Sequence, residues 1–546
     1  MTRLRDLSRK EGRLKGLGGL NTSPLGPASA GSDKGDSVVE PYNRTLAPEK
    51  VWQKPAPLNG GSGFFFAPAI RSQVVTIPRM IDLKQLRDDP DRFADGARKK
   101  GVEVDIPRVL ELDERRRSLV QEQEGLRAEQ RTIEKAMGPE IGKLMGRLKK
   151  AQGDEKASIE SEVAELKNRP IALKEKIQAL DAPLGEVDAA LQEELLRIPL
   201  PPDGDVPVGA SSDDNVERSR WAPSWWDWDK SFEANKGFAP KTHMELVRDL
   251  GLVDFERGVK VSGARSYVLT GLGMRLHQAV LRYAFDYMVE ENGFTAASAS
   301  ALVREESMVG TGFFPAGRDQ AYVIDETGRG GSHDYFLAGT GEVGLMSLHQ
   351  DEILDEEDLP RTYTTVSPCY RREAGAAGRD TAGLYRIHQF EKVEQVVICK
   401  ADEAESRAWH AKMIGFVEEL LRRLELPHRQ LQCCTGDLGV KNADMIDLEC
   451  WMPGRGEEDA NGRPTGAFGE THSASRLYDY QCRRLNLRCR GESTGGKPAV
   501  AHSLNNTVIA SPRVLIPILE MHQNADGTVT VPEALRPHMG GRDVIA

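Results

Sequence analysis

The stretch PCYRREAGAAGRDTAGLYRIHQFEKVE, residues 368–394, gathers cations, carboxylates and aromatic side chains around a glycine-rich loop. We expect two antiparallel strands joined by that loop. Because side chains alternate along a strand, Arg371 and Glu373 should share one strand face, and Phe390 and Glu394 should follow on the returning strand. A guanidinium can bind a phosphate, a carboxylate can accept from an adenine amino group, and an aromatic face can stack on the base. The stretch is a candidate nucleotide site, although spacing alone leaves open a commoner alternative, a salt-bridged hairpin.

The whole chain is acidic, with a formal net charge of −11 over 546 residues, of which 29% are charged and 39% are apolar. Such a length and composition indicate a globular protein of two or three domains. The acidic balance argues against nonspecific coating of nucleic acid, but it leaves open a local basic surface that binds one nucleic acid. No apolar run reaches about 18 residues, so we expect no membrane span.

The cysteine pattern indicates a reducing compartment. The chain has seven cysteines, an odd number, and none of them form a C-x-x-C motif. We therefore expect buried thiols and a cytoplasmic protein, rather than a disulfide framework or a zinc site.

Residues 1–79 are rich in Gly, Ser, Pro and charge without sustained periodicity, which predicts disorder. Met80 looks like a fresh start. Three interpretations of the first 79 residues are open: an over-long start, a genuine flexible tail, or a targeting segment whose pattern Asp6 and Glu11 disturb.

Residues 80–200 form a predicted N-terminal domain whose main feature is a long helical hairpin over about 109–195. Apolar residues recur every seven positions from Leu112 to Ile133, and a second series runs from Ile159 to Leu191 after a polar break. Two helices of about 40 residues rising about 1.5 Å per residue would make an antiparallel coiled-coil arm on the order of 60 Å long. Gly138-Pro139 and Pro170 should kink it locally. A dimerisation rod is the alternative, while basic residues near the turn favour a partner with phosphates: Lys143, Arg147, Lys149, Lys150 and Lys156.

A Pro-rich linker, 201–219, separates this region from one large domain, 220–546. The domain shows no strand–helix alternation with Gly-rich turns and no G-x-x-x-x-G-K-[ST], so a parallel nucleotide-binding sheet and a P-loop are disfavoured. We predict an α+β fold in which an antiparallel sheet is flanked by helices.

The stretch at 368–394 closely resembles motif 2 of the class II aminoacyl-tRNA synthetases, and specifically that of the seryl-tRNA synthetases. Further segments agree in the right order, from about Met80 to the end: GTGFFP (310–315), GTGEVGLMSLHQDEIL (339–354), GETHSASRLYDYQCRRLNLR (469–488) and HSLNNTVIASPRVLIPILE (502–520). The resemblance implies a class II catalytic domain carrying a tRNA-binding arm, and a homodimer.

The resemblance implies an ATP site in which Arg371 and Arg513 are catalytic: Arg371 holds the α-phosphate and Arg513 clamps the γ-phosphate of a bent ATP. Glu373 would bind the adenine amino group, Ile387 would offer backbone contacts, and Phe390 would stack on the ring. Without the resemblance, Arg513 reads as a surface cation and Phe390 as core. The full implied ATP-binding set is Arg371, Arg372, Glu373, Ile387, Phe390, Glu470, Thr471, His472, Ser473 and Arg513.

Glu470 and Ser473 match the family's metal-binding strand end, and a carboxylate with a hydroxyl suits Mg²⁺. Thr471 and His472 stand where smaller or apolar residues are usual in the family, so a nucleotide contact from His472 is the least secure of the set. The implied serine site comprises Thr340, Gly341, Glu342, Arg371, Glu394, Asn505 and Thr507. Its small polar pocket would penalise alanine, which leaves hydrogen-bonding groups unpaired.

Two departures from the family pattern stand out. Ala299 and Ser300 replace the usual prolines of motif 1, which shapes the dimer interface, and Gly341 replaces a usual alanine, a change we expect to be mild.

The resemblance implies a ligase that activates L-serine with ATP and transfers it to the 3′ end of tRNA(Ser), and also to tRNA(Sec) where the organism has one. The arm would grip the long variable arm of the tRNA. Two alternatives are a serine-activating ligase for a carrier protein, which would lack the arm, and a catalytically silent RNA-binding paralogue, which would have lost Arg371, Glu373, Glu394 or Arg513.

Overall fold

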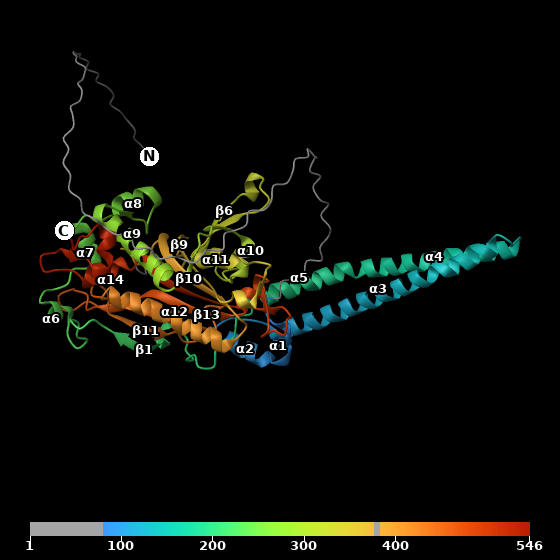
Figure 1. Ribbon diagram of the computed structural model, residues 1–546, viewed down its shortest axis with the longest axis horizontal. Helices are drawn as coiled ribbons and strands as arrows, with labels where there is room; N and C mark the ends of the chain where they lie inside the picture. Colours follow the sequence, from blue (N-terminus) through green and yellow to red (C-terminus); the bar gives the residue numbers. More distant parts are fainter. Residues whose placement is uncertain (1–79, 376–382) are drawn as a thin grey trace, which may run out of the picture. The chain divides into compact units, whose positions relative to one another are not determined.

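The computed structural model describes residues 80–375 and 383–546 (Figure 1). The prediction of disorder for residues 1–79 lies outside the described residues, as does the middle of the glycine-rich loop between the two predicted strands.

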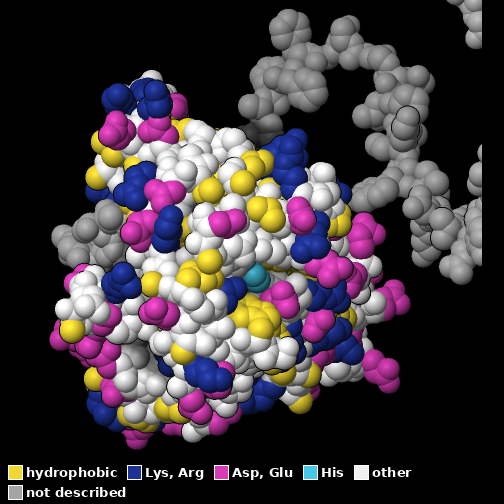
Figure 2. Space-filling model, turned by 90° about the vertical axis from the view of Figure 1, so that its left-hand side faces the viewer, with side chains coloured by type: hydrophobic (Ala, Val, Ile, Leu, Met, Phe, Trp, Pro, Cys, Tyr) yellow, Lys and Arg dark blue, Asp and Glu magenta, His cyan; other side chains and the backbone are white. Residues whose placement is uncertain are grey.

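Several expectations from the sequence can be compared directly with the structure. All seven cysteines are buried free thiols. Among the described residues, no helix combines the length and the apolar character that crossing a membrane requires. On the face shown in Figure 2, acidic and basic side chains are interspersed with apolar ones, so neither positive nor negative side chains form a large separate patch there.

The N-terminal region is helical: α1 (Leu83–Asp88), α2 (Pro90–Lys99), α3 (Ile106–Leu148), α4 (Asp154–Ala179) and α5 (Asp181–Arg197). The helical pattern breaks before Pro90: α1 ends at Asp88, Asp89 caps α2, and Pro90 occupies the first turn of α2, where no backbone donor is needed.

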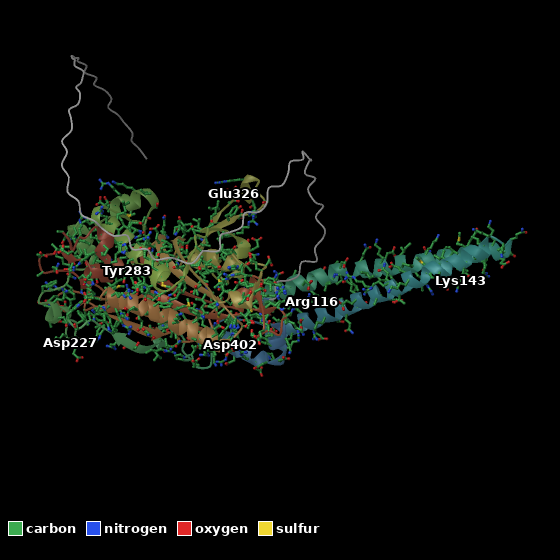
Figure 3. All side chains as sticks on the ribbon, viewed as in Figure 1. Arg116, Lys143, Asp227, Tyr283, Glu326 and Asp402 are labelled. Atoms are coloured by element: carbon green, nitrogen blue, oxygen red, sulfur yellow. The ribbon has the colours of Figure 1, made fainter. Side chains whose placement is uncertain are left out.

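Helix α3 runs antiparallel to α4 and α5, which confirms the predicted coiled-coil arm. Arg116 of α3 contacts Asp188 of α5 at 2.7 Å, and farther along the arm Leu144 packs with Ile159 and Val163. Arg116 and Lys143 mark the two ends of the paired region in Figure 3. The returning limb was predicted as one helix but consists of two, which meet at Leu180. Both long helices continue through their internal prolines.

The large domain is built on an eight-stranded sheet in the order β1-β11-β12-β13-β16-β10-β9-β4. All neighbours are antiparallel except β4 and β9. The strands are β1 (Val216–Trp221), β4 (Thr295–Ala296), β9 (Arg361–Tyr370), β10 (Gln389–Cys399), β11 (His428–Gln432), β12 (Asp444–Met452), β13 (Ala467–Tyr478) and β16 (His502–Ser511). The predicted class, an antiparallel sheet flanked by helices, is confirmed. Strand β1 begins within the segment that the sequence predicts to be a linker.

Strand β10 divides its side chains between the two faces of the sheet. Val393 and Val397 join the main core with α9 (Gly271–Asp286) and α12 (Glu403–Arg423). On the other face, Val396 and Ile398 pack with Leu345 of α11 (Gly341–Ser347). The same face carries Phe390, Lys392 and Glu394 farther along the strand, because side chains alternate at period two. One face of β10 is thus core from Val393 onward, while the other changes from core to polar site.

Shorter elements complete the domain. The helices are α6 (Phe232–Lys236), α7 (His243–Asp249), α8 (Phe255–Ser262), α10 (Glu305–Gly310), α13 (Tyr480–Arg484) and α14 (Leu515–Met521). The strands are β2 (Val253–Asp254), β3 (Val268–Leu269), β5 (Leu302–Arg304), β6 (Tyr322–Ile324), β7 (Tyr335–Leu337), β8 (Ile353–Asp355), β14 (Arg488–Arg490), β15 (Ala499–Val500), β17 (Val529–Thr530) and β18 (Val544–Ile545).

The base of the arm packs on the loop that precedes β12. Lys100 is buried, and its Nζ donates to the carbonyl oxygens of Asn442 at 2.6 Å and Gly439 at 3.0 Å. Burial lowers the pKa of Lys100 to about 7. Leu200 donates its backbone N–H to the Val440 carbonyl at 2.8 Å. The 439–443 loop is therefore held by the N-terminal region.

Candidate active site

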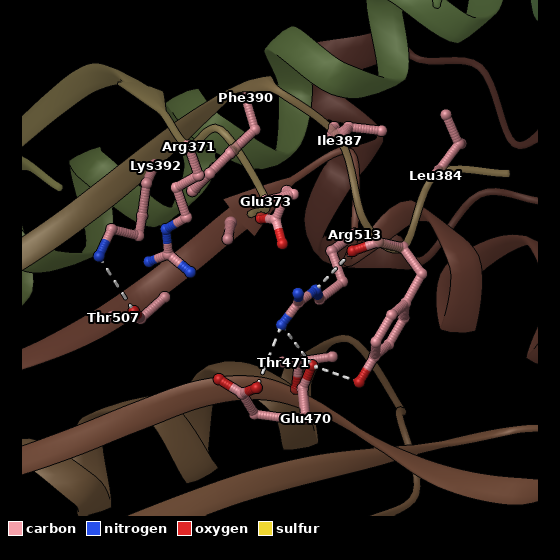
Figure 4. Close-up of a pocket in the computed structure, with 12 residues that line it drawn as sticks. Arg371, Glu373, Leu384, Ile387, Phe390, Lys392, Glu470, Thr471, Thr507 and Arg513 are labelled. Carbon is pink, nitrogen blue, oxygen red and sulfur yellow. Dashed lines mark hydrogen bonds and ion pairs between the residues drawn. The ribbon is translucent and has the colours of Figure 1, made fainter. Parts of the chain in front are cut away.

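A pocket opens where β10, β13 and β16 meet the loops that follow β9 and β16 (Figure 4). Its lining residues are Arg371, Glu373, Leu384, Tyr385, Ile387, Phe390, Lys392, Glu470, Thr471, Thr507, Ala510 and Arg513. Guanidinium groups, carboxylates and an aromatic ring thus converge from segments more than a hundred residues apart in the sequence.

Arg371 follows directly after the last residue of β9. Its backbone N–H donates to the carbonyl of His388 at 3.0 Å, and its carbonyl oxygen lies 3.0 Å from His388 Nδ1. These contacts extend the β9–β10 pairing by one step and fix where the side chain starts. The guanidinium lies 5.3 Å from the centre of the Phe390 ring, which is within the range of a cation–π interaction. Arg371 is thereby held over the returning strand and reaches into the pocket.

The prediction that Arg371 and Glu373 share a strand face is wrong, because β9 ends at Tyr370. Glu373 has a φ of 53°, in the left-handed region, so the direction of its side chain is set by a turn. Gln320 holds that turn, accepting from the backbone N–H of Ala374 at 3.1 Å and donating to its carbonyl at 3.0 Å. The Glu373 carboxylate still reaches the pocket, where Arg386 donates to it at 2.6 Å.

Arg513 supplies the second guanidinium, from the segment between β16 and α14. Its Nε donates to the Tyr385 carbonyl at 3.1 Å and its Nη1 to the Glu470 carbonyl at 3.0 Å. The Glu470 carboxylate lies 3.4 Å away, and the Arg513 guanidinium is 4.4 Å from the centre of the Tyr385 ring. Figure 4 shows the Arg371 and Arg513 side chains pointing into the same space. The pocket therefore has two separately anchored cations suited to one polyanion.

A buried polar network adjoins the inner end of the pocket. Lys392 forms an ion pair with Glu394, and its Nζ also lies 2.9 Å from Thr340 Oγ1 and 3.4 Å from Thr507 Oγ1. Thr340 Oγ1 in turn lies 3.1 Å from Glu394 Oε2. Burial raises the pKa of Glu394, and the charge of Lys392 opposes that shift. Lys392 lies between Phe390 and Glu394 on the same face of β10, because side chains alternate at period two. Its position in the site could therefore have been predicted from the sequence.

Glu342, in the first turn of α11, accepts hydrogen bonds from two further side chains. Lys441 Nζ and Gln481 Nε2 each lie 2.6 Å from its Oε1 atom. Gln481 also donates to the Thr311 carbonyl at 2.9 Å and accepts from Ser503 at 3.0 Å. Lys441 and Gln481 were not predicted: Lys441 lies in a segment without a local signal for a site, and Gln481 lies within 469–488 but beyond the positions to which roles were assigned.

Asn505 lies on β16 opposite Val396, which places it on the same sheet face as Thr507 and Glu394. Its Nδ2 is buried without a hydrogen-bond partner among the described residues, and so is Thr365 Oγ1. Buried polar atoms are rarely left unpaired in native proteins. The site therefore has polar groups open for a small polar ligand.

The residues around Glu470 fit a hard cation. Its side chain is 47% exposed at the pocket, and the nearby Ser473 pairs with Asp447 across β13 and β12. Within the described part of the chain Asp447 Oδ1 is buried without a hydrogen-bond partner, and burial together with the charge of Glu470 raises the pKa of Asp447 well above its usual range. An excess of oxygen donors with negative charge is the environment that Mg²⁺ prefers. Asp447 was not among the predicted residues.

Comparisons with known proteins agree with this geometry. Residues 80–202 match the seryl-tRNA synthetase N-terminal domain, and residues 322–522 match the class II tRNA synthetase core domain for G, H, P, S and T. The chain is 40% identical to the serine–tRNA ligase of Deinococcus radiodurans over 466 residues, which cover 85% of this chain and 99% of that protein. The chain belongs to the seryl-tRNA synthetase family.

Solved structures of the family agree as well. Seryl-tRNA synthetase from Pyrococcus horikoshii, crystallised with ATP, has a TM-score of 0.68 at 34% identity, covering 85% of this chain and 99% of that one. The cytoplasmic serine–tRNA ligase of Naegleria fowleri, in complex with AMP, has a TM-score of 0.68 at 26% identity, covering 86% and 98%. The resemblance predicted from the sequence motifs is confirmed.

His472, the least secure of the residues implied by the family, does not line the pocket. It pairs with Leu448, a core residue, and its Nδ1 lies 2.8 Å from Thr471 Oγ1. A register shift at this point leaves Thr471 as the extra residue, which brings Glu470 and Thr471 to the pocket while His472 stays in the interior. Burial lowers the pKa of His472 to about 3, so it is neutral. Arg372 and Ser473 also lie outside the pocket lining, and the backbone of Arg372 donates to the Gln320 carbonyl instead.

Gly341 stands where the family usually has alanine, and the residues that surround it in the structure explain the glycine. A Cβ atom at this position would lie 2.6 Å from Thr365 Cγ2 and 2.8 Å from Ser367 Oγ. Both neighbours are buried on β9, next to Glu394 on β10. The expectation of a mild change therefore does not follow from the geometry, because the family's usual alanine does not fit these neighbours without movement.

We predict that Gly341→Ala displaces α11 or β9 and so moves Glu342 relative to Glu394. Serine-dependent ATP–pyrophosphate exchange should lose about tenfold in kcat/KM for serine, since a misplacement of about 1 Å can cost that much or more. The KM for ATP should change little. Gly415→Ala on α12, where an added Cβ atom meets nothing within 4 Å, is the comparison variant and should leave the serine KM unchanged. A wild-type serine KM in Gly341→Ala would show that Thr365 and Ser367 accommodate the methyl group.

Proposed function

We propose that this chain is a serine–tRNA ligase, which activates L-serine with ATP as seryl-adenylate and transfers the serine to the 3′ end of tRNA(Ser). The observation that carries the proposal is the pair of anchored guanidinium groups, Arg371 and Arg513, beside a buried polar network. Membership of the family supports it.

In the proposed first step, the carboxylate oxygen of serine attacks the α-phosphorus of ATP, the new O–P bond forms, and the bond to pyrophosphate breaks. Arg371 contacts the α-phosphate and neutralises the charge that develops there, without a covalent enzyme intermediate. Arg513 holds the γ-phosphate. Because neighbouring carbonyls, a ring and a backbone pairing fix both guanidinium groups beforehand, little reorganisation is needed as charge moves.

The adenine would bind at the outer end of the pocket. Phe390 offers its ring for stacking, Glu373 accepts from the adenine amino group, and the backbone of Ile387 contacts the base. Glu470 and Ser473 would hold Mg²⁺, which would neutralise phosphate charge when bound. Asp447, which pairs with Ser473 across the strands, adds a further carboxyl group to that position.

Serine would bind in the inner network. Thr340 and Glu342 receive its α-ammonium, and the backbone at Gly341 lies beside it. Glu394, Asn505 and Thr507 surround the hydroxyl group. The unpaired Nδ2 of Asn505 supports this assignment, since alanine would leave that donor unsatisfied.

Transfer of the seryl group assigns a role to the arm. We infer that residues 80–200 are a tRNA-binding domain, 201–219 a linker and 220–546 the catalytic domain, and that the arm holds tRNA(Ser) and tRNA(Sec) where present. Exposed cations near the turn between α3 and α4 are placed to contact phosphates. They are Lys143, Arg147, Lys149, Lys150 and Lys156.

The family's dimer would use the open edge of the sheet. Strand β4 of the motif 1 segment pairs only with β9, at the end of the strand order. Leu302, which closes this segment, is 42% exposed, and Ile353 and Leu348 are 45% and 48% exposed. Ser300 makes up for the absent proline by accepting from the Leu302 N–H at 3.1 Å, which fixes a local turn. We propose a homodimer through this face, and a cytoplasmic location alongside the tRNA substrate.

The direct test of the proposed chemistry is Arg371→Ala in serine-dependent ATP–pyrophosphate exchange. We expect at least a hundredfold loss of kcat, because removing one preorganised contact to developing charge costs about 10²–10³ in rate. Arg248→Ala, an exposed arginine that pairs with Asp249, serves as the matched control and should exchange normally. Near-normal exchange by Arg371→Ala would refute its role, and no exchange by the wild type with serine would refute the proposed function.

Shortening the arm separates the two steps. Residues 120–184 can be replaced by a short Gly-Ser turn that leaves the Arg116–Asp188 ion pair and the base of the arm intact. We expect normal pyrophosphate exchange, because the pocket lies entirely within the catalytic domain. Charging of tRNA should fall by at least a hundredfold in kcat/KM for tRNA. Equal loss of both activities in a folded variant would contradict this division of labour.

A further inference from the structure

We propose that Lys441 tunes the affinity of the amino-acid site: it occupies Glu342 as a built-in counter-ion and weakens the binding of the substrate's α-ammonium group. The inference rests on the proposed function, since it takes Glu342 as the group that receives that ammonium.

The charges around the inner network are already balanced without a substrate. Glu394 pairs with Lys392, and Glu342 pairs with Lys441 at 2.6 Å. Three of these four side chains are at most 7% exposed and that of Lys441 is 13% exposed, so water screens them weakly. An incoming α-ammonium is therefore a third cation beside two carboxylates, and it must share Glu342 with Lys441.

Lys441 cannot move aside easily, because the backbone on either side of it and its ammonium group are both held. The carbonyls of the residues on either side accept hydrogen bonds from the N-terminal region, Val440 from Leu200 at 2.8 Å and Asn442 from Lys100 at 2.6 Å. Lys441 Nζ also lies 4.1 Å from the centre of the Phe313 ring. The cation is thus a fixed part of the site.

Lys441 is not needed to orient Glu342. Gln481 donates to the same Oε1 atom at 2.6 Å, and Gln481 is itself fixed by Thr311 and Ser503. The Oε2 atom of Glu342 makes no hydrogen bond with the described residues. An ammonium at Oε2 would come within about 5 Å of Lys441 Nζ, where two unit charges repel strongly in a weakly screened site. The distinct contribution of Lys441 is therefore its charge.

The consequence is a higher KM for serine than the same pocket would have without this cation. Burial lowers the pKa of Lys441, and the charge and hydrogen bond of Glu342 oppose that shift. Lys441 thereby sets the range of serine concentration over which the site fills.

The experiment measures the serine KM in ATP–pyrophosphate exchange for the wild type and for Lys441→Met, Lys441→Gln and Lys441→Arg. Both neutral variants should lower the serine KM about tenfold with an unchanged KM for ATP. Lys441→Gln keeps a donor to Glu342, so it separates charge from hydrogen bonding. Lys441→Arg should stay within about twofold of the wild type. Lys230→Met, which removes an exposed cation paired with Asp227, controls for net charge.

Two competitive inhibitors test the physical cause. Serinol carries the ammonium but no carboxylate, and L-glycerate carries a carboxylate but no ammonium. In the neutral variants the Ki of serinol should fall with the serine KM, while the Ki of L-glycerate should stay constant or rise. An unchanged or raised serine KM in both neutral variants, or an equal gain for L-glycerate, would overturn the proposal. Serine-dependent exchange by the wild type establishes the proposed function independently of these outcomes.

Discussion

The register of β10 between β9 and β16 is the constraint on which the site depends. Because ten consecutive residues of β10 pair with β9, the alternation of its side chains cannot slip. One face therefore packs against α9 and α12 in the core, while the other carries Phe390, Lys392 and Glu394 at the site. The two neighbouring strands then deliver Arg371 and Arg513 at the same end of the sheet, each just beyond a strand and each anchored by backbone contacts.

This arrangement explains why an acidic chain gathers cations in one stretch. The guanidinium groups at the outer end face open space suited to a polyanion, whereas the lysines at the inner end neutralise buried carboxylates. Removing one partner of a buried ion pair costs about 3–5 kcal/mol, because the remaining charge is left without compensation. Lys392 and Lys441 therefore belong to the stability of the inner network as well as to its chemistry.

The fold and much of the site could be predicted from the sequence, because strand alternation and heptad spacing are local patterns. The period of β10 places Phe390 and Glu394 together, and the seam of the arm predicts its antiparallel helices. The predictions that were wrong concern residues where the regular strand pattern is interrupted. Glu373 sits in a turn with positive φ that Gln320 holds from a distant segment, and an extra residue at Thr471 keeps His472 in the core. Lys441, Gln481 and Asp447 escaped notice because their partners lie on other strands and helices.

The most direct measurement is a crystal structure of the full chain with a non-hydrolysable seryl-adenylate analogue. We expect the phosphate-mimicking group within hydrogen-bonding distance of the Arg371 guanidinium, with the adenine against Phe390. We also expect the α-ammonium at Glu342 and the hydroxyl beside Asn505 and Thr507. An analogue bound outside this pocket, or bound here with its phosphate mimic away from Arg371, would contradict this expectation.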